Sequence, residues 1–95
     1  MLSNEEIIDL IFKCVEELNR QLSEENKLAL EETTAIAGKN SPLDSLGLVT
    51  LMLCIEGHLA VLGVRVNFLD KFSESSDLPF VTIGEMSLWL LDQLR

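Results

Sequence analysis

Apolar residues recur every three or four positions near the start of the chain, and this pattern predicts an amphipathic helix. Such spacing places side chains along one side of a helix. Ser3 followed by Glu6 forms a capping box, in which each residue satisfies a backbone N–H at the helix start. The predicted helix therefore begins directly after Ser3. Its apolar positions are Ile7, Leu10, Ile11, Cys14, Val15, Leu18 and Leu22.

A second helix is predicted from about Ser45 to about Leu62, again from three- and four-residue spacing. Gly63 follows the last apolar position and is well suited to end the helix in a left-handed conformation. The main apolar side of this helix comprises Leu48, Leu51, Met52, Ile55, Leu59 and Leu62, and it is widened by Leu46, Val49 and Leu53.

The connection between these two helices, from Ser23 to Asp44, has weaker periodicity. Turn-forming residues cluster in its second half, which indicates a loop. We expect its three apolar side chains, Leu28, Leu30 and Ile36, to anchor the loop on the core. Because a long loop without any regular structure is uncommon in a small domain, we also expect a short helical turn within it.

The last helix is predicted to start after Thr82, which forms a second capping box with Glu85. Its apolar side consists of Met86, Trp89, Leu90 and Leu94. Between Gly63 and this helix we expect a loop, a short third helix near Asn67 to Phe72, and a polar turn up to Pro79. Four helices without a repeat predict an all-α fold, a small four-helix bundle with a long first loop.

Length and charge narrow the classes of function. The 95 residues suffice for one domain, 1–95. The net charge of −9 disfavours nucleic acid as a partner, because phosphate backbones are bound by clustered Lys and Arg. The acidic N-terminus lacks the positive segment of a signal peptide, and no apolar run approaches the roughly 20 residues that span a bilayer. We therefore expect a cytoplasmic protein without membrane insertion, and a monomer.

The residues that usually support catalysis or metal binding are few and widely spaced. His58 lies thirteen residues after Ser45 on the predicted second helix, about 20 Å away, so the two cannot form a nucleophile–base pair. Cys14, Cys54 and His58 do not have the paired spacing of a structural zinc site. We interpret both cysteines as free packing residues, and we predict neither a metal site nor an enzyme.

The most informative segment is 44–56, in which Asp44, Ser45 and Leu46 open an apolar helix that reaches Glu56. This segment resembles the acyl carrier protein family, whose signature is an Asp-Ser-Leu at the start of an apolar helix with acidic residues. The segment Val81–Met86 resembles the opening of the family's last helix. Residues 38–43 are similar to an atypical bacterial branch of stand-alone carriers. The stretch between Gly63 and Pro79 matches the family poorly.

The resemblance implies that Ser45 carries a covalent 4′-phosphopantetheine arm, on which acyl groups are held as thioesters. A phosphopantetheinyl transferase would attach the arm, and acyl-loading and acyl-transfer enzymes would be the partners, as in lipid or polyketide biosynthesis. A serine at a helix start also suits a phosphodiester, because that end carries partial positive charge. Residues expected to meet partners are Asp44, Leu46, Gly47, Thr50, Cys54, Glu56 and Gly57.

The chain departs from fatty-acid carriers on the exposed side of this helix. Gly47, Thr50 and Gly57 stand where many carriers have carboxylates, and no Lys or Arg lies between Asp44 and Gly63. The first 32 residues instead carry −6 of the net charge. This pattern favours a dedicated pathway over general fatty-acid synthesis. With Val61, the residues Gly47, Thr50, Cys54 and Gly57 are expected to form an exposed stripe of mostly small side chains.

Alternatives remain open at this point. Serine is a common N-terminal helix cap, and the tripeptide also occurs by chance. Ser41 is a nearby serine, but it precedes Pro42 and is predicted to be a loop residue. The arm could serve an aminoacyl or peptidyl carrier. The chain could also be a helical interaction module that is never modified.

Overall fold

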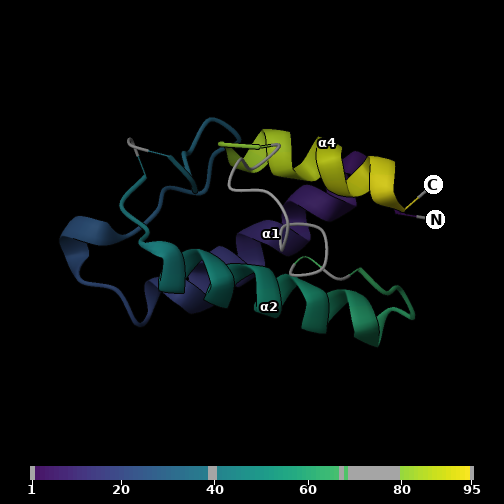
Figure 1. Ribbon diagram of the computed structural model, residues 1–95, viewed down its shortest axis with the longest axis horizontal. Helices are drawn as coiled ribbons and strands as arrows, with labels where there is room; N and C mark the ends of the chain where they lie inside the picture. The colour runs from purple at the N-terminus through teal and green to yellow at the C-terminus, as the bar shows by residue number, and fades with distance from the viewer. Residues whose placement is uncertain (1, 39–40, 67, 69–79, 95) are drawn as a thin grey trace.

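Three α-helices make up the regular structure of the part of the chain that the computed structural model describes, residues 2–38, 41–66, 68 and 80–94. They are α1 (Asn4–Asn19), α2 (Ser45–Val61) and α4 (Ile83–Gln93), with a 3-10 turn, η1 (Glu24–Asn26), between the first two. Over these residues the fold is all-helical and has no strand. Figure 1 shows α1 between α2 and α4. The predicted third helix lies outside the described residues, except for Phe68, so the fourth helix of the bundle stays a prediction.

Both predicted capping boxes are present. At the start of α1, the Glu6 N–H donates to Ser3 Oγ at 3.2 Å, and the Ser3 N–H donates to Glu6 Oε1 at 3.1 Å. At the start of α4, the Glu85 N–H donates to Thr82 Oγ1 at 3.2 Å, and the Thr82 N–H donates to Glu85 Oε1 at 3.0 Å. These reciprocal bonds satisfy N–H groups that have no partner within the helix, and they set where each helix begins.

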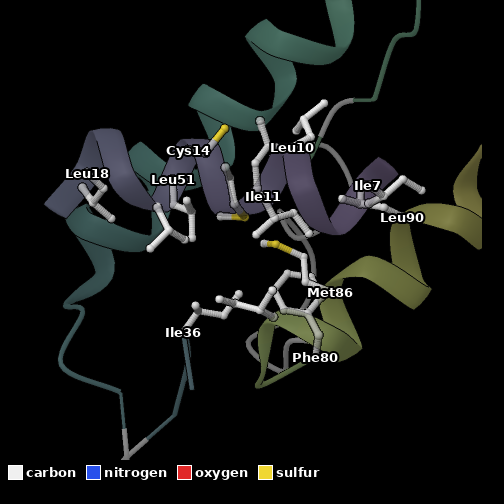
Figure 2. Close-up of a cluster of buried hydrophobic side chains, with 14 of the residues drawn as sticks. Ile7, Leu10, Ile11, Cys14, Leu18, Ile36, Leu51, Phe80, Met86 and Leu90 are labelled. Carbon is white, nitrogen blue, oxygen red and sulfur yellow. The ribbon is translucent and has the colours of Figure 1, made fainter. Parts of the chain in front are cut away.

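The apolar side of α1 forms the centre of the core and packs against both α2 and α4. Six of its seven predicted apolar positions are buried, while Leu22 lies beyond the helix and is half-buried. Figure 2 shows side chains from α1, such as Ile11, meeting Leu51 of α2 and Met86 of α4. At the N-terminal end of α1, Asn4 forms a hydrogen bond with the buried Ser87 hydroxyl of α4. A single apolar helix side therefore holds the other two helices.

The long connection between α1 and α2 is anchored rather than structureless. The side-chain amide of Asn19 accepts from the Leu28 N–H at 2.8 Å and donates to the Leu28 carbonyl at 3.0 Å. Leu28 and Ile36 are buried, as predicted, and η1 supplies the expected helical turn. The prediction for Leu30 was wrong, because 41% of this residue is exposed. Ala37 is buried in place of Leu30, and backbone hydrogen bonds of the loop provide further attachment.

That attachment runs between the loop and the segment that leads into α4. Ala35 and Thr82 form an isolated antiparallel bridge pair. Around it, the Ile36 N–H donates to the Val81 carbonyl at 2.7 Å, the Ile83 N–H donates to the Thr34 carbonyl at 3.0 Å, and the Gly84 N–H donates to the Glu32 carbonyl at 2.9 Å. These bonds fasten the loop that ends at α2 to the start of α4.

The end of α2 has the left-handed glycine that was predicted. Gly63 has a φ of +80°, which residues with a Cβ rarely adopt. Its N–H donates to the Ala60 carbonyl and the Val64 N–H donates to the Leu59 carbonyl, the hydrogen-bond pair of a Schellman motif. Val64 and Val66 then follow in irregular structure, in agreement with the predicted loop.

Two helical glycines allow a test of the loop–α4 contact. A Cβ at Gly84 would lie 3.2 Å from the Glu32 carbonyl oxygen, whereas a Cβ at Gly57 would have no neighbour within 4 Å. Gly57→Ala should therefore raise the free energy of unfolding by up to about 1 kcal/mol through helix propensity. Gly84→Ala should lower it, because the loop must move. Urea unfolding followed by circular dichroism measures both, and equal stabilisation by the two variants would contradict the close approach.

Candidate functional site

The start of α2 is set by Asp44, which acts as the N-cap. Its Oδ1 accepts from the Gly47 N–H at 2.7 Å, and its carbonyl accepts from the Leu48 N–H at 3.0 Å. Ser45 is the first residue of the helix, at the position that the sequence predicts. The capping oxygen therefore comes from the residue before the serine. A requirement for an N-cap does not account for a serine at position 45.

The first turn of α2 differs from those of the other two helices in its charge. The first turn of α1 contains Glu5 and Glu6, and that of α4 contains Glu85, whereas the first turn of α2 contains no acidic residue. Carboxylates in a first turn interact favourably with the positive end of the helix dipole. At the start of α2 the carboxylate is instead the cap itself, Asp44, and no second acidic side chain follows within the first turn.

The residues that lead into α2 pack closely around the cap. Ser41 lies in the loop, as predicted, and its Oγ accepts from the Leu43 N–H at 3.1 Å. A Cβ at Gly47 would lie 3.2 Å from both Leu43 Cδ2 and Asp44 Oδ1. Gly47 therefore leaves space for the cap and for the loop side chain. This is a local structural reason for a glycine at a position that was also predicted to meet partners.

The exposed side of α2 is broader and more apolar than the predicted stripe. Of the five stripe residues, only Gly57 and Val61 are exposed; the other three are half-buried. Cys54 is half-covered by α1, with which it shares a hydrogen bond. The exposed residues of α2 are all uncharged: Leu46, Leu53, Gly57, Ala60 and Val61. This set is named the α2 apolar face.

Glu56 makes a contact within the fold. Its Oε1 accepts from the Phe68 N–H at 2.6 Å, and the Phe68 ring is buried against Trp89, with ring centroids 5.4 Å apart. The carboxylate thus helps to hold the segment after α2 on the core. A role of Glu56 in partner recognition stays a prediction.

A second group of polar side chains lies between α1 and α2, and the sequence did not predict it. Cys14 and Glu17 come from α1, and Cys54 and His58 come from α2. Their four candidate ligand atoms all lie within 4.8 Å of one another. The cysteines are free thiols, as predicted, and His58 is half-buried. These four residues are named the α1–α2 cluster.

Hydrogen bonds within the cluster converge on one carboxylate oxygen. The Cys54 thiol donates to Glu17 Oε2 at 2.8 Å, and His58 Nε2 lies 3.3 Å from the same oxygen. Both contacts lower the pKa of Glu17, and the hydrogen bond from the Cys54 thiol has the larger effect. Burial is the main factor that raises the pKa of the Cys14 and Cys54 thiols. The cluster is thus one connected unit that spans both helices.

A groove lies at the opposite end of α2 from Ser45. It has a volume of about 570 Å³ and is lined by residues from the first two thirds of α1, by His58 and Val61 of α2, and by Leu62, which caps the end of α2. Since α2 has 17 residues, its two ends are separated by roughly 26 Å. The groove is therefore not part of the site at the start of α2.

No protein-family model, curated protein or solved structure matches the chain. Over the described ranges, none of the helices combines the length and the apolar character that crossing a bilayer requires. The assignment of function therefore depends on the residues and their geometry.

The cap can be tested separately from any function. Asp44→Ala should lower the free energy of unfolding by about 1 kcal/mol, because the Gly47 N–H loses its acceptor. Asp44→Ser keeps an oxygen at the cap and serves as the matched control, with a loss of only a few tenths of a kcal/mol. Denaturant titration followed by Trp89 fluorescence measures both. An equal loss in the two variants would show that Asp44 does not act through its capping oxygen.

Proposed function

We propose that the protein is a carrier that holds acyl intermediates as thioesters on a 4′-phosphopantetheine arm attached to Ser45. The observation that carries this proposal is the position of Ser45 as the first residue of α2, with the cap supplied by Asp44. The resemblance of residues 44–56 to acyl carrier proteins supports the same residue. On this proposal the protein is not itself an enzyme, and it works in the cytoplasm.

The chemistry of the site fits the arm. Its phosphodiester would be attached at the start of a helix of 17 residues, where the partial positive charge of the dipole favours an anion. Asp44 at the cap is the only acidic side chain at this helix start, and its Oδ1 is engaged by the Gly47 N–H. Ser45 would hold the arm, and the terminal thiol of the arm would hold the acyl group.

Loading would be the work of a phosphopantetheinyl transferase. The Ser45 oxygen forms a bond to the phosphorus next to pantetheine in coenzyme A, and adenosine 3′,5′-bisphosphate leaves with the electrons of the broken P–O bond. A base on the transferase takes the hydroxyl proton. The task of this chain is to present the serine at the start of α2, where the preceding loop is fastened to the core.

The α2 apolar face supports a partner that binds along α2 by shape and apolar area. Its members near Ser45 are Leu46, which is 73% exposed, and Leu53, which is 49% exposed. Between Asp44 and Gly63 the only acidic residues are Asp44 and Glu56, so this helix offers few carboxylates to a basic surface on a partner. A dedicated set of loading and transfer enzymes is the corresponding proposal, for acyl cargo or, as the alternative, for aminoacyl or peptidyl cargo.

The attachment site is tested by mass. Incubated with coenzyme A and a broad-specificity transferase, the protein should gain the mass of one phosphopantetheine arm. Ser45→Ala should gain none, because the attacking oxygen is absent. Ser41→Ala is the matched control and should be modified like wild type, since Ser41 lies in the loop. Intact-protein mass spectrometry measures all three.

Two results would count against this assignment. Modification of Ser45→Ala would move the arm to another residue. Failure of wild type with the broad-specificity enzyme, and absence of the arm from protein purified from its native host, would favour an unmodified interaction module that uses the α2 apolar face alone.

The partner surface is tested by the rate of loading. Leu46→Asp places a charge and its hydration next to Ser45, so we expect kcat/KM of the transferase to fall about tenfold, or ~1.4 kcal/mol. Val61→Asp makes the same change at a residue that is 87% exposed, about 24 Å along the helix from Ser45, and should load at nearly the wild-type rate. Added salt should slow loading of wild type only modestly, because the face bears no charge.

Equal rates for Leu46→Asp and wild type would remove the α2 apolar face from partner recognition. A steep loss of loading with salt would point instead to the acidic residues of the first third of the chain. Circular dichroism of each variant shows whether α2 is retained.

A further inference from the structure

The α1–α2 cluster combines residue types that the carrier proposal does not use. Cys14 and Glu17 are three positions apart on α1, and Cys54 and His58 are four positions apart on α2. On a helix, side chains three or four positions apart lie on the same side. Each helix thus presents a pair of potential ligands, and the two pairs meet where α1 packs against α2.

The donor set is that of a zinc site. Two sulfurs, one imidazole nitrogen and one carboxylate oxygen are all ligands that Zn²⁺ takes in tetrahedral coordination. Mg²⁺ and Ca²⁺ prefer oxygen ligands in larger numbers, and thiolates select for softer ions. The cluster therefore discriminates by chemistry between Zn²⁺ and the common hard cations.

The spacing of the donor atoms also suits a zinc ion. Zn²⁺ bonds of 2.0–2.3 Å in a tetrahedron place neighbouring ligand atoms roughly 3.3–3.8 Å apart. In the cluster, Glu17 Oε2 lies 2.8 Å from Cys54 Sγ and 3.3 Å from His58 Nε2, and no two ligand atoms are more than 4.8 Å apart. Side-chain rotations that move the ligand atoms by about 1 Å would bring the longest separation into the tetrahedral range.

An ion can reach this place from solvent. Cys14 is buried at the base, while the side chains of Glu17 and His58 are 50% and 38% exposed. A cavity of about 240 Å³ lined in part by Cys14, Glu17 and Cys54 opens beside the cluster. A disulfide between the cysteines would use two of the four groups and leave the carboxylate and the imidazole without a role, so a metal accounts for more of the arrangement.

We propose that the α1–α2 cluster binds one Zn²⁺ ion through four protein ligands and thereby joins α1 to α2. Each thiol releases its proton to solvent as it becomes a ligand. The ion would replace the present hydrogen bonds to Glu17 with coordination bonds. Four protein ligands leave no open position, so the site is structural rather than catalytic. The proposal does not depend on the arm, since Cys54 lies nine positions after Ser45, roughly 13 Å along α2.

The test uses the full, reduced chain, with Zn²⁺ and Co²⁺ as metal probes and Mg²⁺ for comparison. Zn²⁺ titrated in competition with a chromophoric chelator should bind with one-to-one stoichiometry and raise the midpoint of thermal unfolding. Co²⁺ at the same site should give sulfur-to-metal charge-transfer absorption and the intense visible bands of a tetrahedral ion. Cys54→Ser and His58→Gln should each weaken Zn²⁺ binding about tenfold or more.

Matched controls separate the cluster from general attraction to an acidic protein. Glu17→Gln should weaken Zn²⁺ binding, whereas Glu16→Gln, which removes the exposed neighbouring carboxylate, should not. Ser45→Ala should bind Zn²⁺ like wild type, so failure of the carrier proposal and failure of this one are distinguishable.

Three outcomes would overturn the proposal. One is equal Zn²⁺ affinity in wild type, Cys54→Ser and His58→Gln, with circular dichroism showing all three folded. A second is a Co²⁺ complex without sulfur-to-metal absorption. The third is thermal stabilisation by Mg²⁺ equal to that by Zn²⁺. This result would show that the metal ions bind to carboxylates of the acidic protein rather than to the thiols and the imidazole.

Discussion

Burial of the apolar side of α1 is the interaction on which the other elements depend. Each large apolar side chain that it buries contributes about 1.5–3 kcal/mol, and both α2 and α4 pack on this one surface. Once α4 is docked, the backbone bonds around Ala35 and Thr82 fasten the long loop to it. The loop then ends at a defined place, and Asp44 starts α2 there. The location of Ser45 is thus a consequence of core packing several steps away.

Local signals explain most of what was predictable. A capping box lies within four consecutive residues, so Ser3 and Thr82 identify their helix starts without knowledge of the rest of the fold. Gly63 likewise marks the end of its helix through its own backbone conformation, without knowledge of the rest of the fold. The exposed side of α2 was less predictable, because the helix is apolar nearly all round and offers no polar side to compare. Which side faces water is decided by where α1 lies, and α1 half-covers Cys54.

The α1–α2 cluster could not be predicted from the sequence, for a different reason. Its two halves are separated by 40 positions between Cys14 and Cys54, and neither half has the spacing of a familiar zinc motif. Only the register of α1 against α2 brings Glu17 within 2.8 Å of Cys54 Sγ. A sequence pattern cannot give that register, because it arises from how two apolar sides interlock. The prediction that Leu30 is buried was wrong for a related reason. Its apolar side chain carries no information about the backbone hydrogen bonds that hold the loop.

The uncharged surface of α2 has a consequence for the colloidal behaviour of the protein. A helix with exposed Leu46, Leu53 and Val61 would tend to meet its own copies, and the net charge of −9 opposes this through long-range repulsion. The repelling groups are concentrated in the first third of the chain, so they keep molecules apart without covering α2. Near the isoelectric point of about 4.3 this protection vanishes, and the same surface becomes a route to self-association.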